Sequence, residues 1–182
     1  MIDLTLQQLR AAIPAATVAN CQKYLQAIND AMDIYDINTP LRQAHFLAQI
    51  AWESGSLRYS REIASGKKYE GRKDLGNTQP GDGPRFKGRG LIQVTGRINY
   101  RLYGYAIGID MEANRNWELL EQPKYAADSA GWFWKSHHLN ERADRDEHTN
   151  ITRIINGSTR SAQARLIYLR NAKLALGLLK KR

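Results

Sequence analysis

A dense run of turn-forming residues divides this chain into two helical stretches. Seven glycines and two prolines lie between Ser65 and Gly96, and glycine and proline interrupt both helices and strands. We therefore expect a long loop here. Loops of this length inside compact domains are uncommon and often carry function. The residues concerned are Gly66, Gly71, Gly76, Gly81, Gly83, Gly88 and Gly90, with Pro80 and Pro84.

Before the loop, apolar residues recur with helical spacing. Residues 4–13 fit a short amphipathic helix that stops at Pro14, and residues 18–35 fit a second helix. A third should begin at Thr39, an N-cap followed directly by proline, and should end near Ser54.

After the loop, Pro123 can open a helix and Ser158 can cap a last one. Only residues 91–95 favour a strand, as part of at most a small β-hairpin. We therefore predict a mainly α fold, with a glycine-rich loop lying across a helical body.

Size and composition fit one domain. The 182 residues are enough to bury a core without disulfides, and the single cysteine, Cys21, cannot form an intramolecular one. Cys21 lies in an apolar-periodic stretch and is expected in the core. The start of the chain has no basic region followed by an apolar run, and no segment approaches the length of a membrane span. We therefore expect neither a secretory signal nor a transmembrane helix.

The formal net charge of +9 is unevenly distributed, since no acidic residue follows Glu147. Such a basic segment attracts polyanions, which include nucleic acid, anionic lipid and acidic wall polymers, or it is simply a solvated helix face. Charge alone does not choose among them. The cations are Arg153, Arg160, Arg165, Arg170, Lys173, Lys180, Lys181 and Arg182.

Two glutamates on either side of the turn after the third helix could form a catalytic pair. Glycoside hydrolysis needs one carboxylic acid that protonates the leaving oxygen and one carboxylate on the other face of the sugar. Glu53 suits the acid, because a helix carboxyl end and apolar neighbours such as Trp52 raise a carboxyl pKa. Glu62 suits the base, because Arg58 and Arg61 flank it and favour its ionised form.

Glu70 is the main rival for the role of the base, and any of these glutamates could instead form a surface ion pair.

Amide, hydroxyl and aromatic groups that can hold sugars follow at Gln93, Thr95, Asn99 and Tyr100. Alternatively, Gln93 and Asn99 only satisfy loop backbone. We expect no metal site, because the histidines show no usual ligand spacing. They are His45, His137, His138 and His148.

Five segments, in order, resemble the family 19 glycoside hydrolases, which are the plant-type chitinases and related bacteriophage endolysins. Residues 44–55 (AHFLAQIAWESG) resemble the helix that carries the catalytic acid. Residues 69–72 and 75–83 look like the endolysin branch, and residues 86–100 (FKGRGLIQVTGRINY) are the most specific match. Residues 151–157 (ITRIING) resemble a later Asn-Gly element.

This resemblance, which covers roughly residues 40 to 170, implies a lysozyme-like helical fold and inverting hydrolysis. It implies Glu53 as the general acid, Glu62 as the general base and Thr95 as a holder of the attacking water. The base lies further along the chain in plant chitinases, which keeps Glu70 as an alternative. Trp52 departs from the family, which usually has histidine before the acid. Sugar contacts are expected from Gln93, Asn99, Tyr100, Asn156, Arg165 and Glu70.

We therefore expect an endolysin that hydrolyses β-1,4 bonds between MurNAc and GlcNAc in peptidoglycan during phage-induced lysis. Residues 1–182 would form one catalytic domain, monomeric, without a wall-binding module, cofactor or nucleic-acid partner. The basic C-terminal segment could contact anionic membrane or wall polymer, and a separate pore would release the enzyme from the host cytoplasm. The alternatives are a chitinase acting on GlcNAc polymer, a lytic transglycosylase, and a non-catalytic wall- or nucleic-acid-binding module.

Overall fold

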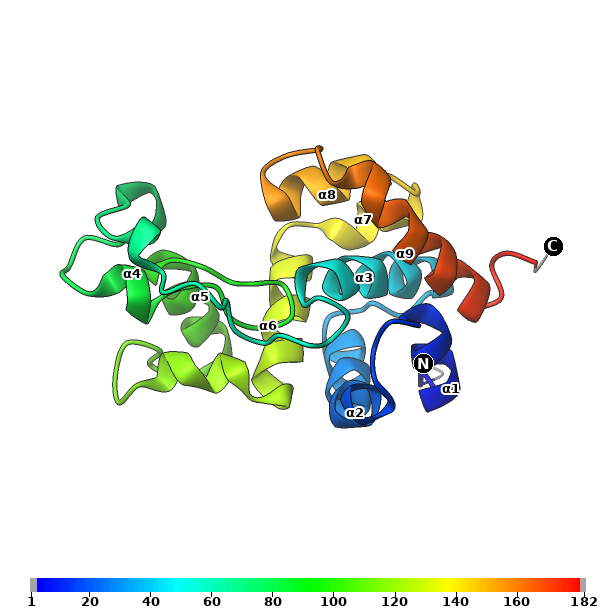
Figure 1. Cartoon of the computed structure of the whole chain (residues 1–182), viewed down its shortest axis with the longest axis horizontal. Coiled ribbons are helices and arrows are strands. Elements are labelled where there is room, and N and C mark those ends of the chain that lie inside the picture. Colours follow the sequence, from blue (N-terminus) through cyan, green and yellow to red (C-terminus); the bar gives the residue numbers. More distant parts are fainter. Residues whose placement is uncertain (1–2, 181–182) are drawn as a thin grey trace.

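The computed structural model describes residues 3–180, and helices make up most of it (Figure 1). This confirms the mainly α prediction. The α-helices are α1 (Leu6–Ala12), α2 (Val18–Ile34), α3 (Pro40–Glu53), α4 (Asp82–Arg85), α5 (Arg97–Ile107), α6 (Pro123–Ser136), α7 (Leu139–Asp144), α8 (His148–Asn156) and α9 (Ala162–Ala175). Three short 3-10 helices are η1 (Lys67–Tyr69), η2 (Lys73–Leu75) and η3 (Asn116–Glu121).

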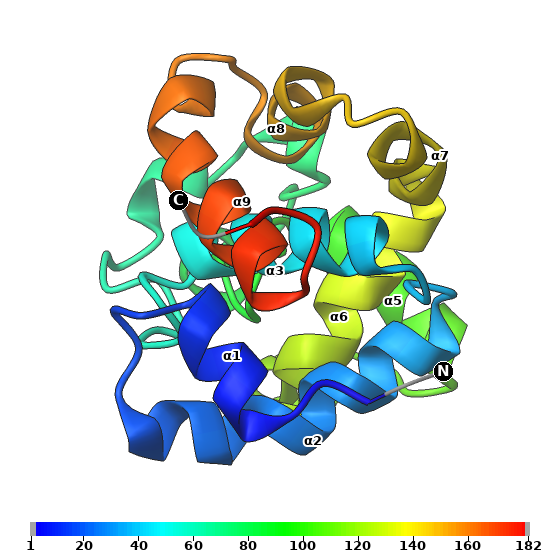
Figure 2. The same ribbon diagram turned by 90° about the vertical axis from the view of Figure 1, so that its right-hand side faces the viewer.

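Helix α3 is the centre of the fold. Thr39 caps it by accepting a hydrogen bond from the Arg42 backbone N–H at 3.2 Å, and Pro40 occupies the first turn. Residues 43–51 are all buried, as expected for a helix that is enclosed on every side. Helices α1, α7 and α9 pack against α3, and Figure 2 shows it surrounded by the rest of the bundle. Helix α2 packs separately against α6.

Most predicted helices form where expected, and Cys21 lies buried in the core. The last helix begins later than expected, since its N-cap is Ser161. Ser158 instead accepts a hydrogen bond from the Arg160 backbone N–H within the preceding turn. Among residues 3–180 no helix is both long and apolar enough to cross a bilayer.

The glycine-rich loop contains short helical turns. Gly66 and Gly81 precede η1 and α4 with φ values of 83° and 85°, a left-handed conformation that glycine adopts without strain. The β-prone run makes no strand among the described residues. Only isolated backbone bridges form, from Arg89 to Arg61 and to Val94. The positive φ of Gln93, 59°, turns the chain before it can extend.

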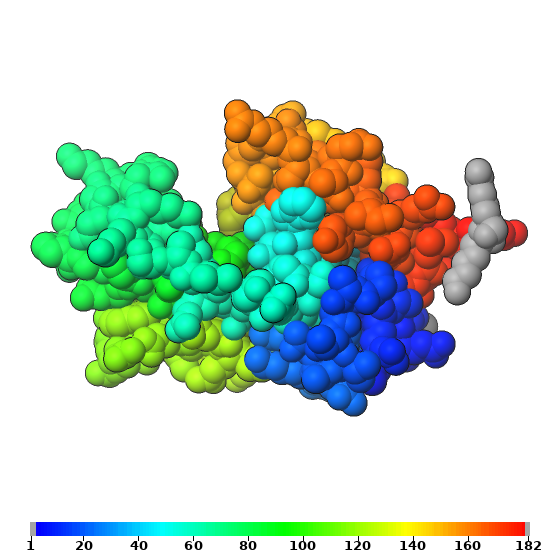
Figure 3. Space-filling view, in the orientation of Figure 1, coloured from blue at the N-terminus to red at the C-terminus, as the bar shows by residue number. Residues whose placement is uncertain are grey.

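The loop, α4, α5 and η3 form a lobe beside the helical body (Figure 1). Figure 3 shows a hollow between this lobe and the orange segment that contains α8. The cyan segment, where α3 ends, borders the hollow. The fold thus brings the carboxyl end of α3 to the edge of a cleft.

Candidate active site

Glu53 is the last residue of α3 and is mostly enclosed. Its Oε1 accepts a hydrogen bond from Nη2 of Arg165 at 2.6 Å, and the side chain remains 16% exposed. Burial raises the pKa of Glu53, outweighing the opposing charge and hydrogen bond of Arg165. A raised pKa keeps a carboxyl group protonated to higher pH, which suits a general acid.

Arg165, on α9, orients Glu53 from behind. Its side chain is completely buried, so the expected direct sugar contact does not fit the structure. Nη1 donates to Oε1 of Gln49 at 2.6 Å and Nε donates to Oγ of Ser161 at 3.0 Å. The guanidinium carbon lies 5.3 Å from the centre of the Trp52 ring. Arg165 therefore uses its rigid donor geometry to fix the acid in place.

Glu62 has the opposite environment. Its Oε1 lies 2.8 Å from Nζ of Lys68, and its Oε2 accepts from the Gly88 backbone N–H at 3.4 Å. Burial acts to raise the pKa of Glu62, but hydrogen bonds from Lys68, Tyr69 and the Gly88 backbone, with the charge of Lys68, outweigh burial and lower it. The cation beside Glu62 is thus Lys68, and the flanking arginines expected in this role are not its ion-pair partners. An ionised carboxylate suits a base.

Glu62, Gln93 and Thr95 converge on one backbone position. A Cβ atom added to Gly88 would lie 3.4 Å from Oε2 of Glu62, 3.4 Å from Oγ1 of Thr95 and 2.7 Å from Oε1 of Gln93. The Thr95 hydroxyl donates to the Gln93 carbonyl at 2.9 Å, and Nε2 of Gln93 donates to the Gly90 carbonyl at 3.0 Å. Three sequence-predicted residues are therefore gathered around one point.

Asn99 and Tyr100, the other two residues expected to contact the sugar in this region, differ in solvent exposure. Asn99 is half-buried, and its Nδ2 donates to the Thr95 carbonyl at 2.8 Å. Tyr100 is fully buried; its hydroxyl donates to the Lys87 carbonyl at 2.6 Å and accepts from Nη1 of Arg89 at 3.2 Å. The expected sugar contact by Tyr100 is therefore wrong, because its ring supports the loop from within.

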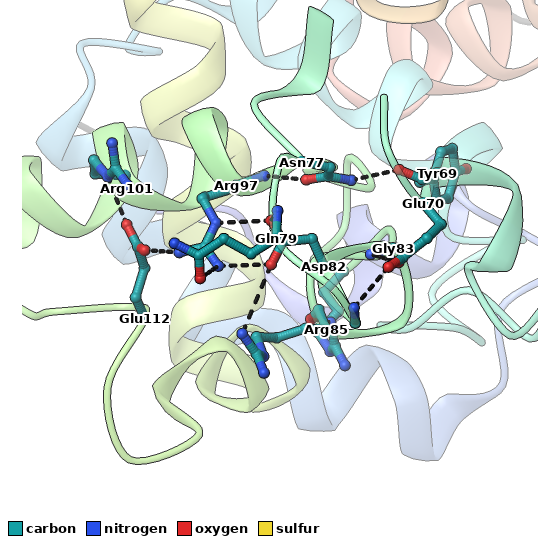
Figure 4. Close-up of polar contacts among 12 residues, drawn as sticks. Tyr69, Glu70, Asn77, Gln79, Asp82, Gly83, Arg85, Arg97, Arg101 and Glu112 are labelled. Carbon is teal, nitrogen blue, oxygen red and sulfur yellow. Dashed lines mark hydrogen bonds and ion pairs between the residues drawn. The ribbon is translucent and has the colours of Figure 1, made fainter. Parts of the chain in front are cut away.

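Glu70 ties the loop together. Its Oε1 accepts from the Gly81 backbone N–H at 2.6 Å and its Oε2 accepts from the Gly83 backbone N–H at 2.7 Å (Figure 4). Both carboxylate oxygens are thus engaged with loop backbone. This arrangement favours Glu62 over Glu70 as the group that activates water.

Arg97 organises the rest of the loop. This role was not predicted from the sequence. It is buried and binds both oxygens of Asp82, at 2.9 and 2.6 Å, and Oε1 of Gln79 at 3.0 Å (Figure 4). Its backbone N–H donates to Oδ1 of Asn77 at 2.9 Å, and its side chain also pairs with Glu112. These partners are too distant in sequence to produce a periodic signal. The network gives the loop a fixed shape beside the cleft.

Asn156 ends α8 on the surface, where its Nδ2 lies 3.5 Å from Oγ of Ser161.

Fewer cations of the basic C-terminal segment are available to a partner than its sequence suggests. Arg165 is buried, and Lys173 pairs with Asp146 at 2.6 Å. Lys181 and Arg182 lie outside the described residues. The cations that stay exposed are Arg153, Arg160, Arg170 and Lys180.

Comparison with known proteins gives relatives of one kind. No family model matches the chain. A glycosyl hydrolase family 19 domain-containing protein from Haemophilus influenzae is 28% identical, over 72% of this chain and 78% of that protein. An endochitinase from Arabidopsis thaliana is 34% identical over 85% of this chain, which spans about half, 53%, of that relative.

Solved structures agree in architecture. Chitinase C from Streptomyces griseus HUT6037 superposes with a TM-score of 0.75 at 23% identity, over 95% of this chain and 76% of that one. A family 19, class IV chitinase from Zea mays gives a TM-score of 0.74 at 20% identity, over 98% of this chain and 95% of that one. This chain has the chitinase-like fold of glycoside hydrolase family 19. The relatives support a glycoside hydrolase, as the sequence predicted.

Proposed function

We propose that this chain hydrolyses the β-1,4 bonds between MurNAc and GlcNAc in bacterial peptidoglycan, with inversion. Glu53 acts as the acid, Glu62 as the base, and Thr95 holds the attacking water. The main support for this proposal is the contrast between the two carboxyl groups. Glu53 is enclosed and has a raised pKa, whereas Glu62 lies beside Lys68 and has a lowered pKa. Such a pair separates acid from base at one pH.

In the proposed reaction, Glu53 protonates the glycosidic oxygen as the bond to the leaving sugar breaks. Glu62 removes a proton from a water on the opposite ring face, and that water attacks the anomeric carbon. The Thr95 hydroxyl, within the cluster around Gly88, helps to orient this water. The mechanism requires roughly 6.5–9.5 Å between the carboxyl groups so that the water fits.

A chitinase acting on GlcNAc polymer is the second candidate, because a curated relative is itself called an endochitinase. The same acid and base would serve either polymer. Reducing-end release from purified peptidoglycan and from chitin, followed by mass spectrometry of the products, separates the possibilities. Ordinary reducing sugar ends, formed from peptidoglycan by the addition of water, support the proposal. Products from chitin alone favour the chitinase, and anhydro-sugar ends indicate a lytic transglycosylase.

We further propose that the biological setting is phage-induced lysis, with the enzyme held in the host cytoplasm until a separate pore releases it. The resemblance of residues 69–72 and 75–83 to the endolysin branch supports this setting. The exposed C-terminal cations would hold the enzyme to anionic membrane or wall polymer. Expression in a bacterial host should lyse cells only when a membrane pore is formed at the same time. Lysis that is independent of a pore would contradict this route.

A further inference from the structure

A separate surface pocket borders the segment that joins the two glutamates. It measures about 380 Å³ and is lined by Arg58, Tyr59, Ser60, Arg61, Ile63 and Glu121. One end adjoins the turn after Glu53, because a Cβ atom added to Gly55 would lie 3.1 Å from the Tyr59 ring. At the other end, Arg61 and Ile63 are the immediate neighbours of Glu62 in the chain. This rim pocket therefore lies along the segment that joins the acid to the base.

Positive charge exceeds negative charge around this rim pocket. The only carboxylate in its lining is Glu121, whose Oε1 already pairs with Arg89 at 2.8 Å. Its Oε2 lies 3.4 Å from Nη1 of Arg61, whose side chain remains 58% exposed. Arg58 makes no ion pair within residues 3–180, and its guanidinium lies 5.3 Å from the Tyr59 ring centre. Two exposed arginines are thus left with hydrogen-bonding capacity for an anion.

Apolar surface lies beside these cations. Ile63 is 79% exposed and Tyr59 is 37% exposed, although both line a concave site. An exposed isoleucine next to exposed guanidinium groups suits a ligand that combines a carboxylate with short aliphatic groups. A neutral sugar polymer carries no carboxylate that could pair with these arginines.

We propose that the rim pocket binds a carboxylate carried by the side groups of peptidoglycan, and so favours peptidoglycan over chitin. This proposal rests on the proposed function. Chitin is an uncharged GlcNAc polymer. Each muramic acid carries a lactyl group whose carboxyl is either free or joined to a stem peptide with carboxylates of its own. Because these groups project from the glycan, they would meet the protein at the rim while the sugar chain occupies the cleft.

Binding is tested in a Glu53→Gln background, which keeps the size of the acid but prevents cutting. Arg58→Gln and Arg61→Gln are added together. The control carries Arg10→Gln and Lys23→Gln, which remove the same charge from exposed positions on α1 and α2. Affinity is measured by co-sedimentation with intact sacculi, with sacculi stripped of stem peptides by an amidase, and with chitin. Equal melting temperatures verify that the variants fold.

The pocket variant should bind intact sacculi about tenfold more weakly than its parent, and the control should change by less than about twofold. A loss on intact sacculi alone assigns a stem-peptide carboxylate. A loss on stripped sacculi as well shows that the pocket also accepts the lactyl carboxylate that the amidase frees. Equal binding by pocket variant and control, or an equal loss on chitin, overturns the proposal. Wild-type hydrolysis of sacculi is assayed separately. Its absence would refute the proposed activity, whereas the binding comparison decides the pocket by itself.

Discussion

Arg165 holds Glu53 through a 2.6 Å hydrogen bond donated from a completely buried position on α9. The acid therefore emerges from the end of α3 with one oxygen fixed, and the fold, rather than a surface contact, sets its direction. Because α9 packs along α3, this single ion pair couples the C-terminal part of the chain to the cleft.

Arg165→Gln should shift the alkaline limb of the pH profile of kcat/KM to higher pH. Arg165 opposes the burial that raises the pKa of Glu53, so its removal raises that pKa further and keeps the acid protonated to higher pH. The maximal rate should fall about 10²-fold because Glu53 loses its orientation. Arg170→Gln, on the exposed side of the same helix, should leave the limb in place. A shift to lower pH would contradict the assignment.

Lys68→Gln should move the acid limb of the profile to higher pH. Lys68 lowers the pKa of Glu62, and the base must be ionised, so without Lys68 the carboxylate gains its proton at a higher pH. Lys68 is exposed, so the shift should stay below about one pH unit and shrink with added salt. The neighbouring exposed Lys67→Gln is the matched control. An acid limb that both variants leave unmoved would exclude Lys68 as the partner of a catalytic base.

Thr95→Val should lower kcat about 10²-fold, because the attacking water loses a hydroxyl partner. Thr95→Ser retains the hydroxyl and should stay within about threefold of the wild type. Steady-state kinetics on both variants, with melting temperatures, provide the measurement. If serine and valine damage turnover equally, the methyl group rather than the hydroxyl matters and the assigned role is wrong.

Stability should fall as the solution is acidified below about pH 6.5 because of His45. The ring is fully buried, and burial lowers its pKa to about 4 despite Asp146 Oδ1 at 2.6 Å from Nε2. The folded pKa thus lies below the unfolded one. The contribution is complete above pH 6.5 and is lost towards pH 4, by about 3 kcal/mol. Denaturant unfolding across this range should show the loss, and His45→Gln should reduce it. A free energy of unfolding that rises towards pH 4 would contradict this.

The centre of the fold could be predicted because its signals are local. Thr39 and the proline after it mark the start of α3, and the apolar run that follows indicates a helix buried on all sides. Helix α5 was not predicted, because Gly104 interrupts its apolar pattern and follows a segment already rich in glycine.

The site shows the same division between local and tertiary information. The helix end at Glu53 and the turn around Thr95 could be read from neighbouring residues. The bond from Arg165 to Glu53 could not, because it joins residues 112 positions apart and Arg165 is one cation in a basic stretch. Only the family resemblance places Arg165 at the site, as a sugar contact. Likewise Lys68, rather than an adjacent arginine, faces Glu62, because the loop folds back over it.

The most direct test of the central claim measures reducing-end release from purified peptidoglycan by Glu53→Gln, Glu62→Gln and Glu70→Gln. All three variants should remain folded, as checked by their melting temperatures. We predict that Glu53→Gln and Glu62→Gln each lose at least about 10³-fold in kcat. Glu70→Gln should lose far less, and only in proportion to loosening of the loop. Near-normal turnover by Glu53→Gln, or a Glu70→Gln variant that is more damaged than Glu62→Gln, would contradict the paired-glutamate mechanism.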